Sequence, residues 1–195
     1  IGVVNFDPMP KMFFNKKLKN FKLTNINQKI KLLSNLKVDF VITKKFDKKF
    51  SKTKALNFIS QILNKKLSSK FIFVSNNFRF GNKREGNVNL LKKYEKLFNY
   101  KVVKPEPLIK NKKIVSSSLI RNLLEKGLLH KANNLLKRYW TIQGVVKKGR
   151  QVGKKIGFPT CNIDIDDYVL AKPGVYAVKV LRKNSDKYLK GIANL

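Results

Sequence analysis

Residues 149–162 read Gly-Arg-Gln-Val-Gly-Lys-Lys-Ile-Gly-Phe-Pro-Thr-Cys-Asn and are the most informative stretch of the chain. Three glycines at intervals of four residues permit backbone turns that other residues avoid and allow the chain to approach a ligand closely. Basic side chains between the glycines add positive charge at the same place. The stretch therefore predicts a phosphate-binding loop. The residues expected to contact phosphate are Gly149, Arg150, Gly153, Lys154 and Gly157.

The end of the same stretch predicts a metal site. If residues 159–163 form a strand, Thr160 and Asn162 project from one face, because side chains alternate between the two faces of a strand. A hydroxyl and an amide oxygen would then converge, which suits a hydrated Mg²⁺ ion that bridges nucleotide phosphates. We expect Cys161, between them, to be a packing residue. The alternative is a glycine-rich hairpin whose polar strand face is simply solvated.

Residues 144–162, ending in Gly-Phe-Pro-Thr-x-Asn, closely resemble the flavokinase module of bacterial bifunctional riboflavin kinase/FAD synthetases. In that family the Thr and Asn of the motif hold the phosphates of magnesium–ATP. The resemblance implies this role for Thr160 and Asn162. Lys154 stands where the family usually has Arg, which keeps the charge but not the planar fork of donors.

The resemblance extends upstream, to the adenylyl-transferring domain that the family carries before the kinase. Residues 74–81, Val-Ser-Asn-Asn-Phe-Arg-Phe-Gly, resemble the segment Val-Gly-x-Asp/Asn-Phe-x-Phe-Gly at the flavin and nucleotide cleft. Residues 114–121 resemble a Ser-Ser-x-x-Ile-Arg segment whose hydroxyls and Arg contact phosphates. The resemblance implies that nucleotide or flavin is bound by Asn77, Ser116, Ser117 and Arg121.

Two positions depart from the family pattern: Met9 replaces the histidine of a Phe-x-Pro-His-Pro turn, and Ser75 replaces a glycine. Structural alternatives also stand beside the implied roles. A serine before an apolar-periodic run is an ordinary helix N-cap, which would account for residues 116–118. Phe78 and Phe80 could be a strand end that faces the core.

The ends of the sequence lack two parts that the family uses in catalysis. A His-x-Gly-His loop precedes the matching region in the family, and the general-base glutamate of the kinase follows it. Here the chain starts at Ile1, and its one histidine, His130, has no histidine partner and is expected to be a surface or packing residue. We therefore expect an internal fragment of a longer protein that is inactive on its own and carries no catalytic residue.

Charge suggests a competing function. The chain has 44 Lys+Arg against 11 Asp+Glu, a formal net charge of +33, and such a field attracts polyanions. Lysine and asparagine both have A/T-rich codons, however, and the lysines are scattered along the chain with no nucleic-acid-binding motif among them. We expect small-molecule substrates and no specific nucleic acid; the alternative is a basic nucleic-acid-binding module, whose affinity would fall steeply with salt.

Cysteine content and hydropathy limit the compartment. Cys161 is the single cysteine, so no intramolecular disulfide can form and a reducing cytoplasm is the expected location. No apolar run reaches the roughly 18–20 residues that span a bilayer, so no membrane partner is expected. The oligomeric state is left open.

Up to residue 136 the pattern alternates short apolar strands with amphipathic helices, which favours a parallel sheet with crossover helices. Asp7, Asn77 and Ser116 would then emerge at the carboxyl ends of strands, where such sheets bind ligands. Helices should start after Thr24 or Asn25, after Ser51 and after Asn87. Predicted strands are residues 1–6, 38–43, 71–75 and 100–103; two further helices, 116–125 with Gly127 as a stop and 128–136, complete this part.

After residue 138 the pattern changes to short β-runs separated by glycine-bearing turns, at 140–147, 160–165, 174–181 and 188–193. The predicted fold is α/β, with a Rossmann-like nucleotidylyltransferase domain over residues 1–137 and part of an antiparallel, riboflavin kinase-like β-barrel over 138–195. The resemblance implies ATP- and Mg²⁺-dependent phosphorylation of riboflavin to FMN and adenylylation of FMN to FAD.

Overall fold

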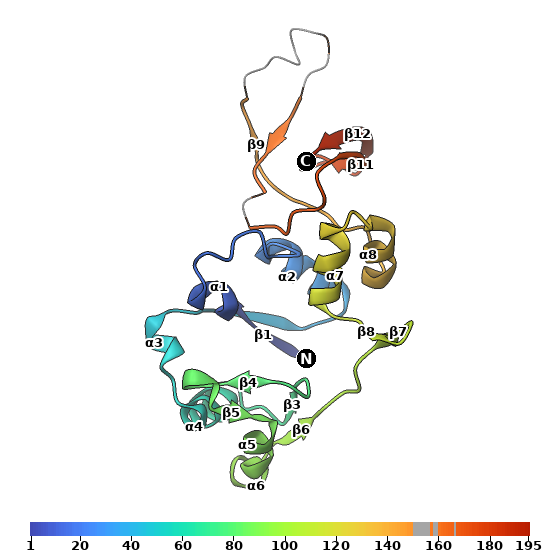
Figure 1. The fold of residues 1–195 in the computed structure, drawn as a ribbon. Helices are drawn as coiled ribbons and strands as arrows, with labels where there is room; N and C mark the ends of the chain where they lie inside the picture. Colours follow the sequence, from blue (N-terminus) through green and yellow to red (C-terminus); the bar gives the residue numbers. More distant parts are fainter. Residues whose placement is uncertain (150–156, 158–159, 166) are drawn as a thin grey trace. The chain divides into compact units, whose positions relative to one another are not determined.

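Helices and strands alternate up to residue 136, and the rest of the chain is mainly β (Figure 1). The computed structural model describes residues 1–149, 157, 160–165 and 167–195. Two compact units are present. Unit 1 consists of Ile1–Gly2, Lys16–Val41 and Val115–Leu195, and unit 2 of Val3–Asn15 and Ile42–Ile114. These units cut the chain differently from the predicted division at residue 137.

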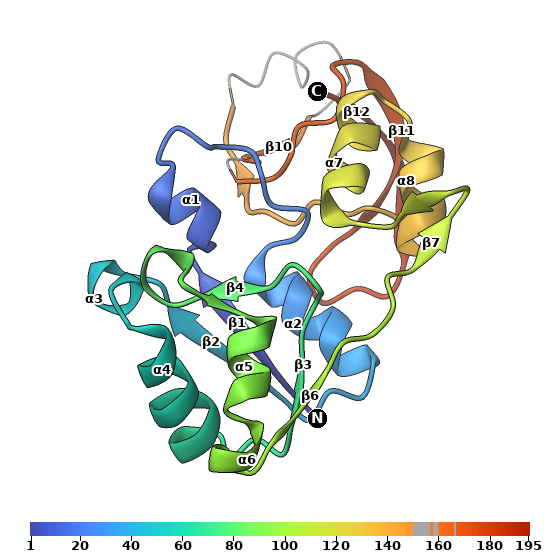
Figure 2. The same ribbon diagram turned by 60° about the horizontal axis from the view of Figure 1, so that its bottom comes forward.

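Unit 2 contains most of the short elements (Figure 2). Its elements, including two strands that start in unit 1, are β1 (Gly2–Asp7), α1 (Pro10–Phe14), β2 (Phe40–Lys45), α3 (Lys48–Ser51), α4 (Ala55–Asn57), the π-helix η1 (Phe58–Lys66), β3 (Phe71–Phe73), β4 (Arg79–Phe80), the 3₁₀ turn η2 (Asn82–Arg84), β5 (Gly86–Asn87), α5 (Val88–Lys93), α6 (Glu95–Phe98), β6 (Lys101–Val103), β7 (Ile109–Lys110) and β8 (Lys113–Ile114).

Parallel strand pairing, as predicted, occurs in this part of the chain. β3 runs parallel to β6, with Ile72 opposite Val102. β1 pairs with β2, and backbone hydrogen bonds from Asp39 to Ile1 and from Phe46 to Asp7 align the two strands in the same direction. All four strands correspond to predicted ones. They form separate two-stranded pairs, however, and not one continuous sheet.

Two of the three predicted helix starts are confirmed. The Asn25 side chain accepts a hydrogen bond from Gln28 N, and the Gln28 side chain accepts from Asn25 N, so a capping box starts α2 (Ile26–Asn35). Asn87 caps α5 through Leu90 N.

The predicted start after Ser51 is wrong. Asp47 accepts a hydrogen bond from Phe50 N and so caps the separate turn α3, which ends at Ser51. The next helix starts at Ala55, whose backbone N–H donates to Glu85 Oε1 at 2.6 Å. The N–H at this helix start is therefore satisfied by a side chain 30 residues away and not by a neighbouring N-cap residue.

The core of unit 2 lies between η1, α5 and the strands. Ile59 and Leu91 are fully buried, and burying such a side chain contributes about 1.5–3 kcal/mol. Phe50, Phe58 and Phe80 pack ring against ring beside them, with centroids 5.3–6.4 Å apart. Phe80, at the end of β4, thus faces the core as the structural alternative predicts, whereas Phe78, which stacks on it at 5.4 Å, is only half-buried.

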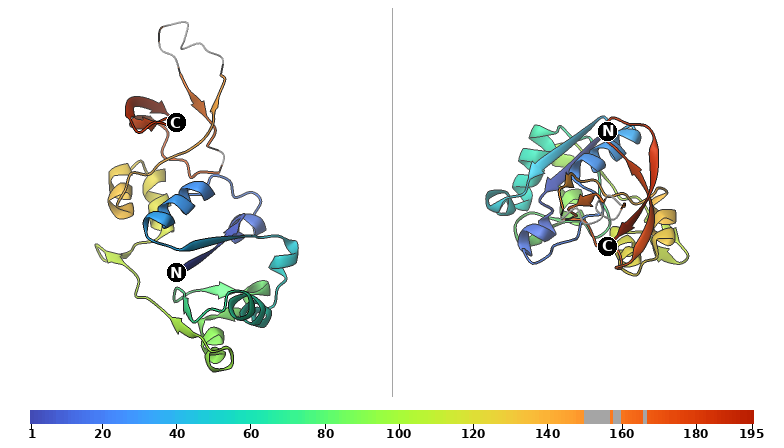
Figure 3. Two further views of the ribbon diagram at one scale, coloured as in Figure 1. Left: turned by 180° about the vertical axis from the view of Figure 1, so that it is seen from behind. Right: turned by 90° about the horizontal axis from the view of Figure 1, so that it is seen from above.

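Unit 1 contains α2, α7 (Ser117–Glu125) and α8 (Leu129–Leu136), and Figures 1 and 3 show α7 and α8 side by side. Gly127, with φ +75°, follows α7 as predicted. The core of this unit joins Leu124 and Ala132 of the helices to Val169, and Trp140 packs against it. Segments on both sides of residue 138 therefore share one core.

The β-part of unit 1 comprises β9 (Val146–Lys147), β10 (Asn162–Ile163), β11 (Val175–Leu181) and β12 (Tyr188–Asn194). β11 and β12, which correspond to the predicted runs 174–181 and 188–193, pair antiparallel, and so do β9 and β10. The predicted strand at 140–147 is reduced to two residues because Trp140 N donates to Asn133 and Gln143 N donates to Tyr168. The chain is thus a mixed α/β fold with parallel and antiparallel pairs. Among the described residues no helix is long and apolar enough to cross a membrane.

Candidate functional site

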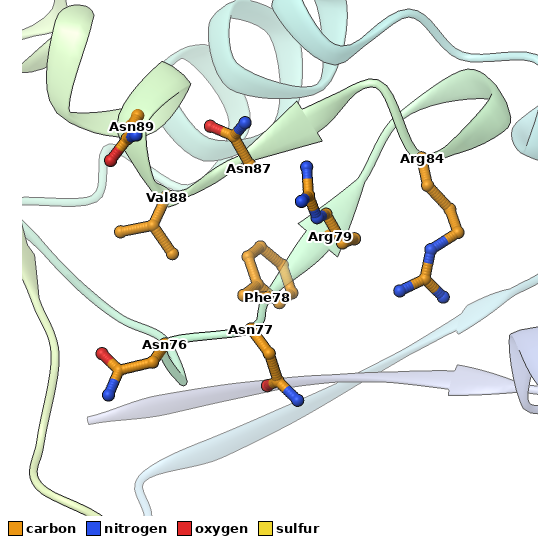
Figure 4. A pocket seen from close by; sticks show the side chains of 8 residues that line it. All are labelled: Asn76, Asn77, Phe78, Arg79, Arg84, Asn87, Val88 and Asn89. Atoms are coloured by element: carbon orange, nitrogen blue, oxygen red, sulfur yellow. The ribbon is translucent and has the colours of Figure 1, made fainter.

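Asn77 borders a hollow of about 330 Å³ within unit 2, beside the β4–β5 hairpin (Figure 4). The hollow is polar and nitrogen-rich, because asparagine amides and arginine guanidinium groups make up most of its wall. Figure 4 shows the Asn77 and Arg84 side chains extending downward and Arg79 extending upward, toward Asn87. The lining residues are Asn76, Asn77, Phe78, Arg79, Arg84, Asn87, Val88 and Asn89.

Ser75, at the position where the family has glycine, holds the Asn77 amide. Its hydroxyl donates to Asn77 Oδ1 at 3.0 Å. Because an amide oxygen and an amide nitrogen lie on opposite sides of the carbon they share, this bond leaves the Asn77 nitrogen to donate elsewhere. The substitution at Ser75 therefore orients Asn77 and does not remove it from the hollow.

Residues 81–86, the loop after β4 together with the first residue of β5, lie directly against Ala55. A Cβ atom at Gly81 would lie 2.8 Å from the Ala55 backbone, and one at Gly86 would lie 2.9 Å from Ala55 Cβ. Real Cβ atoms do not approach other atoms so closely, so both positions require glycine. The Glu85 carboxylate accepts from Ala55 N and fixes the loop at a third point.

Arg84 lies in a part of this loop whose backbone conformation is unfavourable. Lys83 and Arg84 have φ values of +50° and +61°, in the left-handed region, and each such residue costs about 1–2 kcal/mol relative to ordinary helical geometry. Strain of this kind persists where surrounding contacts fix the backbone, often at functional sites. Arg84 was not among the predicted site residues, although an arginine between two glycines, in a chain that mostly uses lysine, is a signal for it.

The second group of predicted residues in the adenylyl half lies on α7, in unit 1. Ser116 Oγ accepts from Leu119 N at 3.2 Å and caps the helix, so the capping alternative is present. Ser117 is exposed at the first helical position. Asn77 belongs to unit 2, so the predicted approach of Asn77 to these serines remains a prediction.

Arg121, on the next turn of α7, is half-buried and engaged with Phe21. Its Nε donates to Phe21 O at 2.7 Å, and its guanidinium carbon lies 3.6 Å from the centre of the Phe21 ring. Burial lowers the pKa of the Arg121 guanidinium, and the nearby Glu125 carboxylate acts in the opposite direction. Arg121 thus has a structural role whether or not its remaining nitrogens bind phosphate.

In the predicted kinase half, two of the expected phosphate-binding positions lie close together. β10 pairs with β9 so that Asn162 lies opposite Lys147, next to Gly149. A Cβ atom at Gly149 would collide with Asn162 Nδ2, so the glycine makes room for the amide. Thr160 is exposed and precedes the strand, which is shorter than the predicted 160–165.

The other predicted kinase residues have separate outcomes. Gly157 has φ +82°, as expected of a glycine turn. Arg150, Gly153 and Lys154, which were also predicted to contact phosphate, lie outside the described residues. The prediction that Cys161 packs inside is wrong: its side chain is exposed, because the short β9–β10 pair does not bury it. His130 is exposed on α8, as predicted.

Thr160 and Asn162 fit the predicted Mg²⁺ role in their chemistry. They offer a hydroxyl and an amide oxygen, the hard oxygen donors that this ion accepts. The Asn162 amide occupies the space that a side chain at Gly149 would fill, and Asn162 is exposed at the surface.

Two protein-family models match the chain. One, described as FAD synthetase, matches residues 1–119, and the other, described as riboflavin kinase, matches residues 136–195.

Curated proteins named bifunctional riboflavin kinase/FMN adenylyltransferase are similar over almost the whole chain. The protein of Buchnera aphidicola subsp. Schizaphis graminum is 39% identical over 99% of the chain and 62% of its own length. That of Haemophilus influenzae is 37% identical over 100% of the chain and 63% of its own length, and that of Escherichia coli K12 is 35% identical over 100% and 62%. The chain thus spans less than two thirds of each of these relatives.

A solved structure supports the fold. A crystal structure titled macrolide-efflux protein from Streptococcus pneumoniae matches with a TM-score of 0.80 at 24% identity, covering 100% of this chain and 62% of that one. At this identity the likeness concerns the fold alone.

Proposed function

Because the chain belongs to the FAD synthetase family of bifunctional riboflavin kinase/FMN adenylyltransferases, we propose that its protein makes FMN and FAD. It would phosphorylate riboflavin to FMN and then adenylylate FMN to FAD, with ATP as the donor in both steps. The observation that carries the proposal is the succession of two family matches, FAD synthetase at 1–119 and riboflavin kinase at 136–195, in one chain.

The finer architecture is part of the proposal. Residues 1–137 would be a Rossmann-like nucleotidylyltransferase domain, which the parallel pairs β1–β2 and β3–β6 support. Residues 138–195 would be part of an antiparallel barrel, which the β11–β12 hairpin supports. A cytoplasmic location rests on the single cysteine.

In the kinase step the chain would chiefly position phosphates and neutralise charge. The glycines of residues 149–157 would let backbone N–H groups reach the phosphates, and Arg150 and Lys154 would add positive charge. Thr160 and Asn162 would orient the terminal phosphate of ATP. A bound Mg²⁺ ion, which these two side chains would help to hold, supplies additional positive charge on the phosphates.

In the adenylyl step, Asn77 would contact flavin or nucleotide from the hollow, and Ser116, Ser117 and Arg121 would contact phosphate at the start of α7. The substrates are small molecules, and the scattered lysines give no reason to add a nucleic acid. Binding that falls by orders of magnitude between 50 and 200 mM salt would favour the nucleic-acid alternative.

Alanine substitutions at Thr160 and Asn162 test the kinase assignment in the full-length protein. We expect each to lower the rate of riboflavin phosphorylation about 10²–10³-fold, since one lost contact to a transferring group typically has this effect. FMN adenylylation should be unchanged. Cys161→Ala is the matched control, because this exposed residue lies between the two and has no proposed role.

Two results would count against the assignment. Unchanged phosphorylation in Thr160→Ala would mean that the Gly-Phe-Pro-Thr-Cys-Asn interpretation is wrong. Equal loss of both activities would indicate damaged folding and not a kinase-specific site.

A further inference from the structure

The hollow beside Asn77 contains two guanidinium groups that the proposed function does not use. Arg79 comes from β4, and Arg84 from the 81–86 loop. In the described part of the chain neither guanidinium has an ion pair or a hydrogen bond to another group. Glu85, the acidic neighbour of Arg84, directs its carboxylate to Ala55 N instead.

The position of Arg84 is fixed by contacts of the loop and not by its own side chain. Gly81 and Gly86 both touch Ala55, which is 2% exposed, and Asn82 N donates to Thr53 O at 2.7 Å. These contacts hold Arg84 at φ +61°, a conformation that an arginine rarely adopts by itself. The fold therefore holds the Arg84 backbone in an unfavourable conformation and places this residue at the edge of the hollow.

The choice of arginine at this place is informative. The chain has 44 Lys+Arg, of which only six are Arg, at positions 79, 84, 121, 138, 150 and 182. Two of the six line one hollow of about 330 Å³. Arginine differs from lysine in presenting a planar fork of donors that matches two oxygens of a phosphate. Because most basic residues of the chain are lysine, two arginines at one hollow indicate that the planar fork of donors matters there.

The wall of the hollow is otherwise suited to a phosphorylated ligand. Asn77, oriented by Ser75, and Asn76 supply amide groups, and no carboxylate lines the hollow. Phe78 adds an apolar ring. The site thus combines two positive charges with neutral hydrogen-bonding groups and one aromatic surface.

We propose that Arg84, whose side chain extends in the same direction as that of Asn77, binds a phosphate group of the ligand that Asn77 contacts. The inference rests on the proposed function for its ligands, which are the phosphomonoester of FMN and the polyphosphate of ATP. Both present the same chemistry, a doubly charged phosphate with paired oxygens. Arg84 is a binding residue that determines affinity for the phosphorylated ligand; no bond is made or broken by it.

The test measures binding to the 195-residue chain by isothermal titration with FMN, riboflavin, ATP and pyrophosphate at one fixed salt concentration. Arg84→Ala should weaken binding of the phosphorylated ligand about 10- to 100-fold, as expected for a lost charge-assisted contact. Arg84→Lys should lose most of the same affinity, because it keeps the charge but not the fork. Riboflavin, which has no phosphate, should bind all variants equally.

Lys83→Ala is the matched control. Lys83 is the adjacent residue of the same loop, is exposed and also has a positive φ, but it does not line the hollow. Its replacement by alanine removes the same charge as Arg84→Ala. We expect less than about a twofold effect from general electrostatics. Far-UV circular dichroism of each variant checks the fold.

Each outcome decides the proposal. Loss for FMN but not ATP assigns the phosphate to the flavin, and the reverse assigns it to the nucleotide. Equal affinities of Arg84→Ala and Lys83→Ala for all four probes would overturn it. If the chain binds neither flavin nor ATP, the proposed adenylyl function fails for this chain. The pyrophosphate titration then decides the phosphate site alone.

Discussion

Replacing Gly81 by alanine should strongly destabilise unit 2. At φ +76° an L-residue costs about 1–2 kcal/mol. The new Cβ would also lie 2.8 Å from Ala55 Cα, Cβ and N, and Ala55 cannot move away, because it is 2% exposed and its N–H is bonded to Glu85. Overpacking of this kind costs about 1–3 kcal/mol. The free energy of unfolding should therefore fall by about 2–5 kcal/mol, a large part of the stability of a small domain.

Amide hydrogen exchange with mass spectrometry measures this effect locally. Amides of η1 (Phe58–Lys66) should exchange roughly 30-fold faster or more, since each 1.4 kcal/mol corresponds to about a factor of ten. Gly127→Ala is the matched control: its φ is +75°, but its Cβ would meet only the flexible Lys172 side chain, at 3.3 Å. It should cost only the backbone term, in unit 1. Equal destabilisation by the two substitutions would refute the role of Ala55.

Two further substitutions test individual hydroxyl groups. Tyr168→Phe should lower the free energy of unfolding of unit 1 by about 1–3 kcal/mol, because the buried hydroxyl donates to Gln28 at 2.6 Å and accepts from Gln143 N; urea unfolding followed by Trp140 fluorescence measures this, and Tyr139→Phe, at an exposed tyrosine, should change little. Burial, with a smaller contribution from the Glu95 carboxylate, raises the pKa of Tyr100 to about 12. The protonated Tyr100 hydroxyl therefore contributes fully to the free energy of unfolding below pH 10, and this contribution is lost between pH 10 and 12. The decline in unfolding free energy over that window should be smaller in Tyr100→Phe, and an unchanged decline would contradict the assignment.

Local chemistry made part of the fold predictable. The Asn25 and Asn87 caps depend on side chains within three residues of the amides that they bond, so the sequence contains all that is needed. The β11–β12 hairpin follows in the same way from two β-prone runs close together in the chain. The motif singled out Asn162, which the structure places beside Gly149, while its role toward Mg²⁺ and phosphate stays a prediction.

Long-range contacts made the rest unpredictable. The helix at Ala55 starts without a capping residue because its free N–H is taken by Glu85, 30 residues away. No local pattern marks that bond, and Ser51 therefore looked like the better start. The predicted strand at 140–147 is also shortened by distant contacts, since the backbone N–H groups of Trp140 and Gln143 donate to the Asn133 and Tyr168 side chains. The contacts of residues 81–86 with Ala55, which place Arg84 at the hollow, join segments about 30 residues apart and are likewise not marked by a local pattern.

The shared core of unit 1 affects how this chain can be divided for protein engineering. Leu124 and Ala132, which lie between the two family matches, pack with Val169 and Trp140, which lie within the second match. A cut at residue 137 would separate these partners and leave each half with an apolar face in water, which promotes aggregation. Chimeras that exchange only one of the two matched regions between relatives should therefore transfer Trp140 and residues 167–172 together with α7 and α8, since these segments pack as one unit.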